Sequence, residues 1–87
     1  MRPSCILCVL KHLGQAAVLM DEANLGYPSH RWLACGHLAE AESEALDKFS
    51  ELAIQIRVAR IAYSLTDCVE PDMTVLIHDA MLLLETS

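Results

Sequence analysis

Residues 24–30 read NLGYPSH, and this stretch divides the first half of the chain into two helical segments. Gly26 is the residue type that most often ends a helix, because it adopts the left-handed conformation at little steric cost. Pro28 cannot continue a helix, and Ser29 is a favourable N-cap for a new one. The stretch therefore predicts a tight turn between two helices that lie side by side.

The segments on either side of this turn have the periodicity of amphipathic helices. Before it, apolar residues recur every three or four positions from Cys5 to Ala23, which predicts a helix with Ser4 as its N-cap. Small side chains let two helices approach closely, and we therefore predict an antiparallel helical hairpin over residues 4–47. The second helix supplies one row of mostly small apolar residues: Ala34, Leu38, Ala41 and Ala45.

The second half of the chain predicts two more helices, over residues 51–65 and from Asp72 or Thr74 to Leu84. A break before residue 51 is favoured because Ser50 is a suitable N-cap, and the alternative is one continuous helix over residues 29–65. The helix over residues 51–65 is apolar on two sides. Its two rows are Leu52, Ile56, Ala59 and Tyr63, and Ile54, Val58, Ile61 and Leu65.

These patterns predict an all-α fold, a small helical bundle with the N-terminal antiparallel hairpin plus one or two further helices. We expect a single helical domain over residues 1–87. One row of the third helix can pack on the hairpin, whereas the other needs a cover. The very apolar fourth helix is expected to cover the third helix, a second subunit, or both, which makes residues 50–85 the expected interface of a homo-oligomer.

The composition excludes several classes of protein. The chain has 87 residues, a formal net charge of −6 and 54% hydrophobic residues. Such a chain collapses, but it is small enough for a metal or a partner subunit to matter to its stability. No cluster of Lys and Arg is present to bind nucleic acid directly, and no apolar run has the length of a membrane span. We expect a soluble, cytoplasmic protein without a signal peptide.

Four Cys and four His form the main chemical signal. Cys5, Cys8 and His12 are spaced i, i+3 and i+7, which places them on one stripe of the first helix. A Cys-x2-Cys pair can hold tetrahedral zinc, and the hairpin turn brings residues near 41–45 level with this stripe. Because helical side chains lean toward the N-terminus, His37 is the preferred fourth ligand, with Glu44 as the alternative.

Other interpretations of these residues stay open. Cys5 and Cys8 can pack as small hydrophobic residues, or they can act as a redox pair. Cys35 is expected in the core, with Gly36 easing contact between helices, while Cys68 is expected in the core and His78 on the surface. Trp32 is expected to seal the end of the hairpin, and the alternative is a hot spot for a partner.

The carboxylates do not match a catalytic pattern. A dimetal bundle needs a Glu from each of two helices and Glu-x-x-His from two others, whereas His37 and Glu40 stand in the reverse order. The acidic residues Glu40, Glu42, Glu44, Asp47 and Glu51 are therefore expected to form a solvated face. Nucleotide-binding fingerprints and nucleophile motifs are absent from the sequence.

The stretch CILCVLKHLGQAAVLMDEANLGYPSHRWLACGHLAEAE resembles a group of small uncharacterised proteins of tailed bacteriophages and related bacterial or environmental sequences. The resemblance covers about residues 5–60, and those proteins have a proline where Ser50 stands. It implies a role beyond packing for the shared Cys and His positions, and it implies no activity. The matching residues are Cys5, Cys8, Lys11, His12, Gly26, Tyr27, His30, Arg31, Gly36, His37 and Glu40.

Together these observations favour a small non-enzymatic protein–protein interaction module of phage type with a structural zinc site. Such a module would modulate a host protein, or bind a phage protein, in the host cytoplasm. One alternative is a small metal-dependent or thiol-based enzyme. The other is a structural oligomer component without metal.

Overall fold

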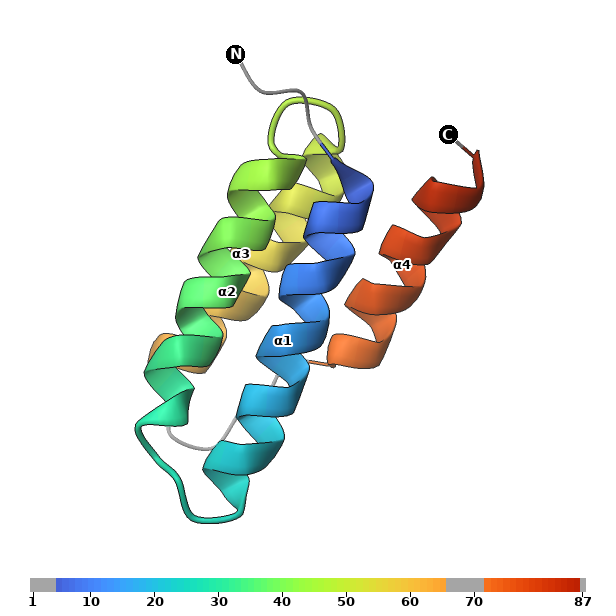
Figure 1. Cartoon of the computed structure of the whole chain (residues 1–87). Coiled ribbons are helices and arrows are strands. Elements are labelled where there is room, and N and C mark those ends of the chain that lie inside the picture. Colours follow the sequence, from blue (N-terminus) through green and yellow to red (C-terminus); the bar gives the residue numbers. More distant parts are fainter. Residues whose placement is uncertain (1–4, 66–71, 87) are drawn as a thin grey trace.

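The computed structural model describes residues 5–65 and 72–86, and these residues form an all-α bundle (Figure 1). The predicted fold class is confirmed, and the fourth helix is present. None of the helices in the described part of the chain is long and apolar enough to cross a membrane. The helices are α1 (Ile6–Asn24), α2 (His30–Ala45), α3 (Ser50–Leu65) and α4 (Met73–Thr86).

α1 and α2 form the predicted hairpin, and their contact is the most extensive in the bundle. Gly26 lies in the turn with φ 121°, a conformation that favours glycine. Val9, Leu13 and Ala16 of α1 are fully buried, and so is the predicted row of α2. The prediction that small residues would let these two helices pack closely is therefore confirmed, and the pattern of α2 predicted its buried side correctly.

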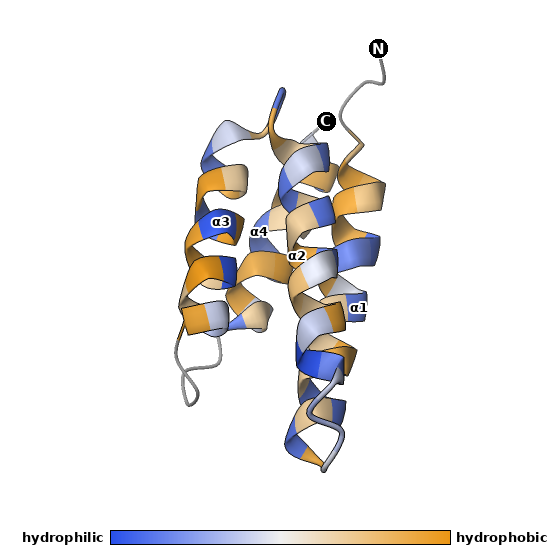
Figure 2. Cartoon of the chain, turned by 90° about the vertical axis from the view of Figure 1, so that its left-hand side faces the viewer, coloured by the Kyte–Doolittle hydropathy of each residue, from blue (hydrophilic) through white to orange (hydrophobic). Residues whose placement is uncertain are grey.

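The remaining helices flank the hairpin on different sides. α3 packs against α2, while α4 packs mainly against α1 and makes few contacts with α3. The sequence predicts a fourth helix that covers the third helix, a second subunit, or both. α4 covers little of α3, and its contact with a second subunit stays a prediction. Ile54, Val58, Ile61 and Leu65 of α3 stay exposed, and Figure 2 shows hydrophobic positions along α3, including its side away from α2.

The helix ends differ from the predictions in detail. Cys5 is the N-cap of α1, whereas Ser4, the predicted cap, lies outside the described residues. Ser29 is the N-cap of α2 but makes no capping hydrogen bond with its side chain. The predicted break between the second and third helices is confirmed, although Ser50 is the first residue of α3 and not its N-cap. Asp72 caps α4, because its carboxylate accepts hydrogen bonds from the backbone amides of Thr74 and Val75.

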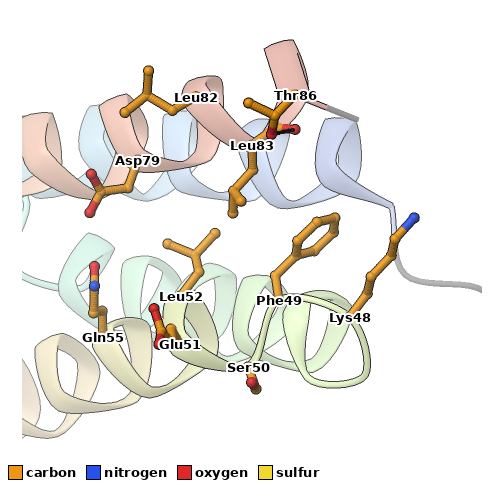
Figure 3. Close-up of a pocket in the computed structure, with 10 residues that line it drawn as sticks. All are labelled: Lys48, Phe49, Ser50, Glu51, Leu52, Gln55, Asp79, Leu82, Leu83 and Thr86. Atoms are coloured by element: carbon orange, nitrogen blue, oxygen red, sulfur yellow. Dashed lines mark hydrogen bonds between the residues drawn. The ribbon is translucent and has the colours of Figure 1, made fainter.

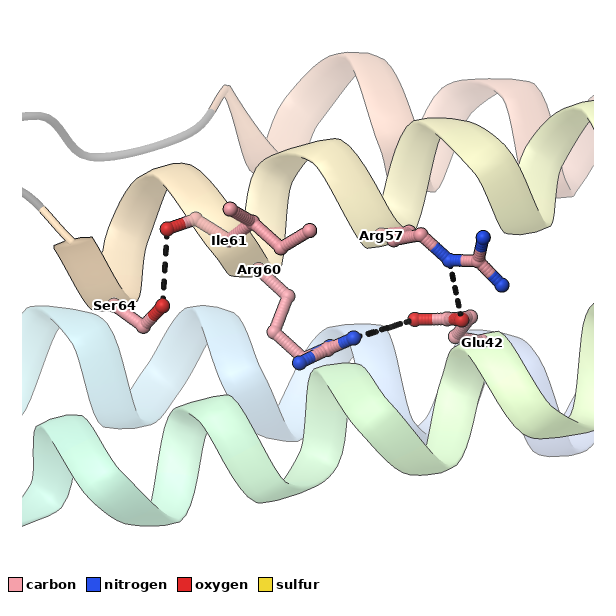
Figure 4. A network of polar contacts seen from close by, with 5 residues as sticks. All are labelled: Glu42, Arg57, Arg60, Ile61 and Ser64. Atoms are coloured by element: carbon pink, nitrogen blue, oxygen red, sulfur yellow. Dashed lines mark hydrogen bonds and ion pairs between the residues drawn. The ribbon is translucent and has the colours of Figure 1, made fainter.

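An ion-pair network joins α2 to α3 (Figure 4). Glu42 accepts from Arg57 at 3.0 Å and from Arg60 at 3.2 Å, and its side chain is only 12% exposed. Burial alone would raise the pKa of Glu42, but the hydrogen bonds and positive charges of both arginines outweigh it and lower the pKa. The prediction of a solvated acidic face is wrong for Glu42. The sequence did contain a sign of this ion pair, because two arginines stand three residues apart in the helix that follows α2.

Gly36 does not ease contact between helices, contrary to the sequence prediction. A Cβ atom built on Gly36 meets no atom within 4 Å, and the residue lies inside α2. We therefore expect Gly36→Ala to stabilise the fold by about 0.5–1 kcal/mol, because alanine loses less backbone entropy in a helix. Thermal unfolding followed by circular dichroism measures this. Gly26→Ala is the matched control and should lower the melting temperature, since its φ is positive. A lower melting temperature for Gly36→Ala would contradict the conclusion that Gly36 lies at an open position of α2.

Removal of the Glu42 charge should destabilise the fold in a pH-dependent way. Because the folded pKa lies below the ordinary value of 4.5, the carboxylate stabilises the fold above pH 4.5 and loses this effect as the pH falls through the folded pKa. Glu42→Gln should cost about 1 kcal/mol near pH 7, which lowers the melting temperature by about 4–8 °C. The difference from wild type should shrink below pH 4.5.

Glu40→Gln is the control for this experiment, because Glu40 is exposed on the same helix. It should melt like the wild-type protein across the pH range. An equal loss in both variants, or a loss in Glu42→Gln that persists in acid, would show that the network does not stabilise the contact between α2 and α3.

Candidate functional site

Cys5 and Cys8 lie together at the amino end of α1. The Sγ atom of Cys5 caps the helix and accepts a hydrogen bond from the backbone amide of Cys8 at 3.4 Å. Hydrogen bonds from the side chain and the amide of Cys8 lower the pKa of the Cys5 thiol, while the negative charge of Glu44 acts in the opposite direction. The first predicted pair of ligands is thus in contact, and Glu44 on α2 faces it closely enough to act on its charge.

His12 and His37 form a second pair, which crosses the hairpin. Their Nδ1 atoms are 3.0 Å apart, and their ring centroids are 5.2 Å apart with the planes tilted by 33°. Both side chains are half-buried between α1 and α2. In the absence of a metal, one Nδ1 donates to the other, and the tautomers decide which. The structure therefore places His37 against His12, as the hairpin register and the lean of helical side chains predicted.

The two pairs are close to each other along α1. Cys8 and His12 are four residues apart in one helix, so their Cβ atoms are neighbours at about 5–6 Å. Within residues 5–65 and 72–86, no group of three or more His, Cys, Asp or Glu side chains converges on a common point. The structure thus places the four predicted ligands in two separate pairs, Cys5 with Cys8 and His12 with His37, and does not bring all four to one point.

The donor set suits zinc. Two imidazole nitrogens on one tetrahedral zinc lie about 3.3 Å apart, since each Zn–N bond is about 2.0–2.1 Å long. The Nδ1 atoms of His12 and His37 are 3.0 Å apart, which is near this separation. Zinc held by all four residues requires the Cys8 side chain to turn from Cys5 toward His12. Glu44, the alternative ligand, is close enough to Cys5 for its negative charge to act on the pKa of that thiol.

The other cysteines and histidines are placed as follows. Cys35 packs partly buried against the core, and burial raises the pKa of its thiol. His78 is exposed on α4 beside Asp79, as predicted. Cys68 lies outside the described residues. The prediction that Cys35 belongs to the core is therefore confirmed in part.

Trp32 does not seal the hairpin, because it is 73% exposed. It belongs to an apolar surface at the turn between α1 and α2, which we call the turn patch. The Tyr27 ring stacks on His30 with centroids 5.4 Å apart. The sequence predicted that Trp32 would seal the end of the hairpin, with a binding hot spot for a partner as the alternative. The exposure of Trp32 excludes the first of these roles and leaves the second as a prediction. The turn patch consists of Leu25, Tyr27, Trp32 and Leu33, which are 55–80% exposed.

A solvent-open groove lies between the start of α3 and the end of α4 (Figure 3). Phe49, Leu52 and Leu83 point toward one another across it, and Lys48 and Asp79 lie at its ends. The groove contains none of the predicted ligands and lacks a cluster of nucleophiles or bases among its lining residues. It therefore adds no chemistry to the Cys/His site.

Comparison of the chain with protein-family models, with curated proteins and with solved structures gave no match.

The environments of the thiols predict different reactivities. In metal-free protein near neutral pH, iodoacetamide should modify Cys5 several-fold faster than Cys35, because the thiolate is the nucleophile and only Cys5 has a lowered pKa. Fragment-ion mass spectrometry of the peptides measures the two rates. Cys8→Ala removes the hydrogen bond from the Cys8 side chain to Cys5 and should reduce the ratio of the Cys5 rate to the Cys35 rate. Equal rates in the wild-type protein would contradict the capping geometry.

Proposed function

We propose that this protein is a small non-enzymatic protein–protein interaction module whose helical hairpin is held by a structural zinc ion. The observation that carries this proposal is the 3.0 Å approach of His12 to His37 across the hairpin, one turn from Cys8. The residues that share this region also carry the resemblance to tailed-phage proteins. In this proposal the module acts in the host cytoplasm and modulates a host protein.

In this proposal Cys5, Cys8, His12 and His37 hold the zinc. The ion supplies no chemistry to a substrate. It joins the first turns of α1 to the middle of α2, and so reduces fraying at the start of the helix. In small domains, metal binding contributes on the order of 10 kcal/mol, which is comparable with the stability of a whole fold of this size.

The turn patch supports the interaction role. Leu25 is 80% exposed, Tyr27 60% and Trp32 73%. Trp and Tyr are enriched among the residues that dominate binding energy at interfaces, whereas single exposed aliphatic residues are common on any surface. A cluster of both kinds at one end of a hairpin is a surface suited to a protein partner.

A thiol-based enzyme is the second candidate, and one observation favours it. Cys5 caps α1 in a Cys-x2-Cys pair, and a helix N-terminus favours a negative charge on the sulfur. Zinc binding and thiol chemistry would use the same two residues, so the metal content of the protein distinguishes the two functions.

Elemental analysis of protein purified without chelator tests the zinc site. We expect one zinc per chain, and we expect a chelator to unfold the protein or to lower its melting temperature by tens of degrees, because the ion contributes a stability comparable with that of the whole fold. Cys8→Ser and His37→Ala should lower zinc content and melting temperature together, because each removes a ligand. Cobalt substitution should give the absorption bands of thiolate coordination, which identify the sulfur ligands directly.

Cys35→Ser is the control outside the site, and it should keep the metal. Glu44→Gln separates the two choices of fourth ligand: loss of zinc in Glu44→Gln with retention in His37→Ala would replace His37 by Glu44. Absence of stoichiometric zinc, with a Cys8→Ser variant that melts like wild type, would overturn the metal site. In that case an oligomer component without metal, or a thiol enzyme if the metal-free protein shows turnover, takes its place.

The same samples test the interaction. Zinc-loaded protein should capture a partner from host lysate, and Trp32→Ala should abolish the capture without a change in melting temperature, because Trp32 is exposed. Leu7→Ala on α1, 62% exposed and remote from the turn, is the matched control and should bind normally. Equal capture by Trp32→Ala and wild type would exclude the turn patch as the binding surface.

A further inference from the structure

The two thiols at the amino end of α1 are in contact with each other at one end of the bundle (Figure 1). The Sγ atom of Cys5 lies 3.4 Å from the backbone amide of Cys8, and the side chain of Cys8 donates a hydrogen bond to the same sulfur. Both cysteines are free thiols, and both are half-buried, so each is partly open to solvent. The structure therefore holds two reduced sulfurs side by side at an accessible position.

The backbone at this position allows a disulfide bond between Cys5 and Cys8. Inside a regular helix, Cβ atoms three residues apart are about 5–6 Å apart, whereas a disulfide needs about 3.5–4.5 Å. Cys5, however, is the N-cap and has the extended torsions φ −128° and ψ 109°. Rotation about its Cα–C bond moves the Cβ atom while the Cys5 carbonyl keeps the hydrogen bond from the amide of Val9. The bond can thus close without unwinding α1.

Cys35, the third cysteine among the described residues, is badly placed to compete for this bond. It lies on α2, nearer the turn than His37, whereas Cys8 lies on α1, one helical turn farther from the turn than His12. The contact between His12 and His37 therefore stands between Cys35 and the two thiols at the start of α1. Within the part of the chain that the structure describes, Cys8 is the natural partner of Cys5.

A disulfide here would remove half of the proposed zinc ligands at once. Zinc binds thiolates, and neither sulfur of a disulfide carries a negative charge. His12 and His37 would remain, but their Nδ1 atoms are 3.0 Å apart and can satisfy each other by a hydrogen bond. The ion would keep two neutral ligands and lose both anionic ones, so its affinity would fall sharply.

We propose that Cys5 and Cys8 form a peroxide-sensitive switch, in which their oxidation to a disulfide releases the zinc ion and frees the start of α1 from α2. This inference rests on the proposed zinc site and adds its regulation. Zinc-loaded protein is then the tied form of the hairpin, and oxidised protein is the untied form.

Hydrogen peroxide is the oxidant in this reaction. One thiolate attacks a peroxide oxygen, which forms a sulfenic acid and expels hydroxide. The second thiolate attacks the sulfenic sulfur, which forms the S–S bond and expels a second hydroxide. The two sulfurs give up two electrons, the peroxide becomes two water molecules after it takes up two protons, and the zinc leaves as Zn²⁺. A dithiol reductant reverses the oxidation and restores both thiolates.

Treatment of the zinc-loaded full chain with hydrogen peroxide tests the switch. A chromogenic zinc indicator should report stoichiometric release of the ion, and mass spectrometry of the peptides should find a bridge between Cys5 and Cys8. The oxidised protein should unfold or melt as the chelator-treated protein does. Dithiothreitol followed by zinc should restore the original melting temperature.

Two variants control the experiment. Cys35→Ser lies outside the switch and should release zinc like the wild-type protein. Cys5→His replaces a thiolate by an imidazole, which zinc also binds, but it cannot form the disulfide with Cys8. It should release zinc several-fold more slowly than wild type under the same peroxide treatment. Should Cys5→His purify without zinc, the peptide map of the wild-type protein still decides whether the bridge forms.

Zinc that stays bound while both thiols stay free, at peroxide concentrations that oxidise glutathione, would overturn the switch and leave the zinc site intact. Release from Cys5→His at the wild-type rate would overturn it too, and so would a first bridge through Cys35 or Cys68. Protein that purifies without zinc rejects the zinc site itself and the release with it. Failure of the switch and failure of the proposed function are therefore distinguishable.

Discussion

The close contact of α1 with α2 is the constraint on which the other features depend. Three of the four residues in the buried row of α2 are alanines, and all four are fully excluded from solvent. With so little side-chain volume between them, the two helices pack closely, and their contact is the most extensive in the bundle. A wider separation would move His12 and His37 apart, and the two pairs of donors would no longer share one face of the hairpin.

The sequence predicted those parts of the fold that follow from local patterns. The turn at Gly26, the buried row of α2 and the break before α3 each depend on a few neighbouring residues. The position of α4 could not be predicted in this way. Periodicity shows that residues such as Leu76 and Ala80 share a buried side, but it does not say which helix covers that side. The burial of Glu42 was missed for the same reason, because its arginine partners lie on another helix.

The sequence predicted which residues of the candidate site stand level on the hairpin, but it did not predict how their side chains are oriented. A turn near residue 26 fixes which residues of α1 and α2 stand level, and the lean of helical side chains then selects His37 as the neighbour of His12. The rotamers of the cysteines were not accessible to such reasoning. Cys5 turns back to cap α1, since the first amides of a helix lack partners, and its Sγ atom accepts a hydrogen bond from the Cys8 amide.

The exposure of Trp32 has a spectroscopic consequence. It is the only tryptophan in the chain, and its indole lies mostly in water in the folded protein. Loss of the fold leaves that indole in nearly the same solvent, so its intrinsic fluorescence responds weakly to denaturation. A molecule that settles over the hairpin turn instead removes water from the ring and shifts the emission to the blue. The protein thus carries an optical reporter that is nearly silent to unfolding and sensitive to contact at one end.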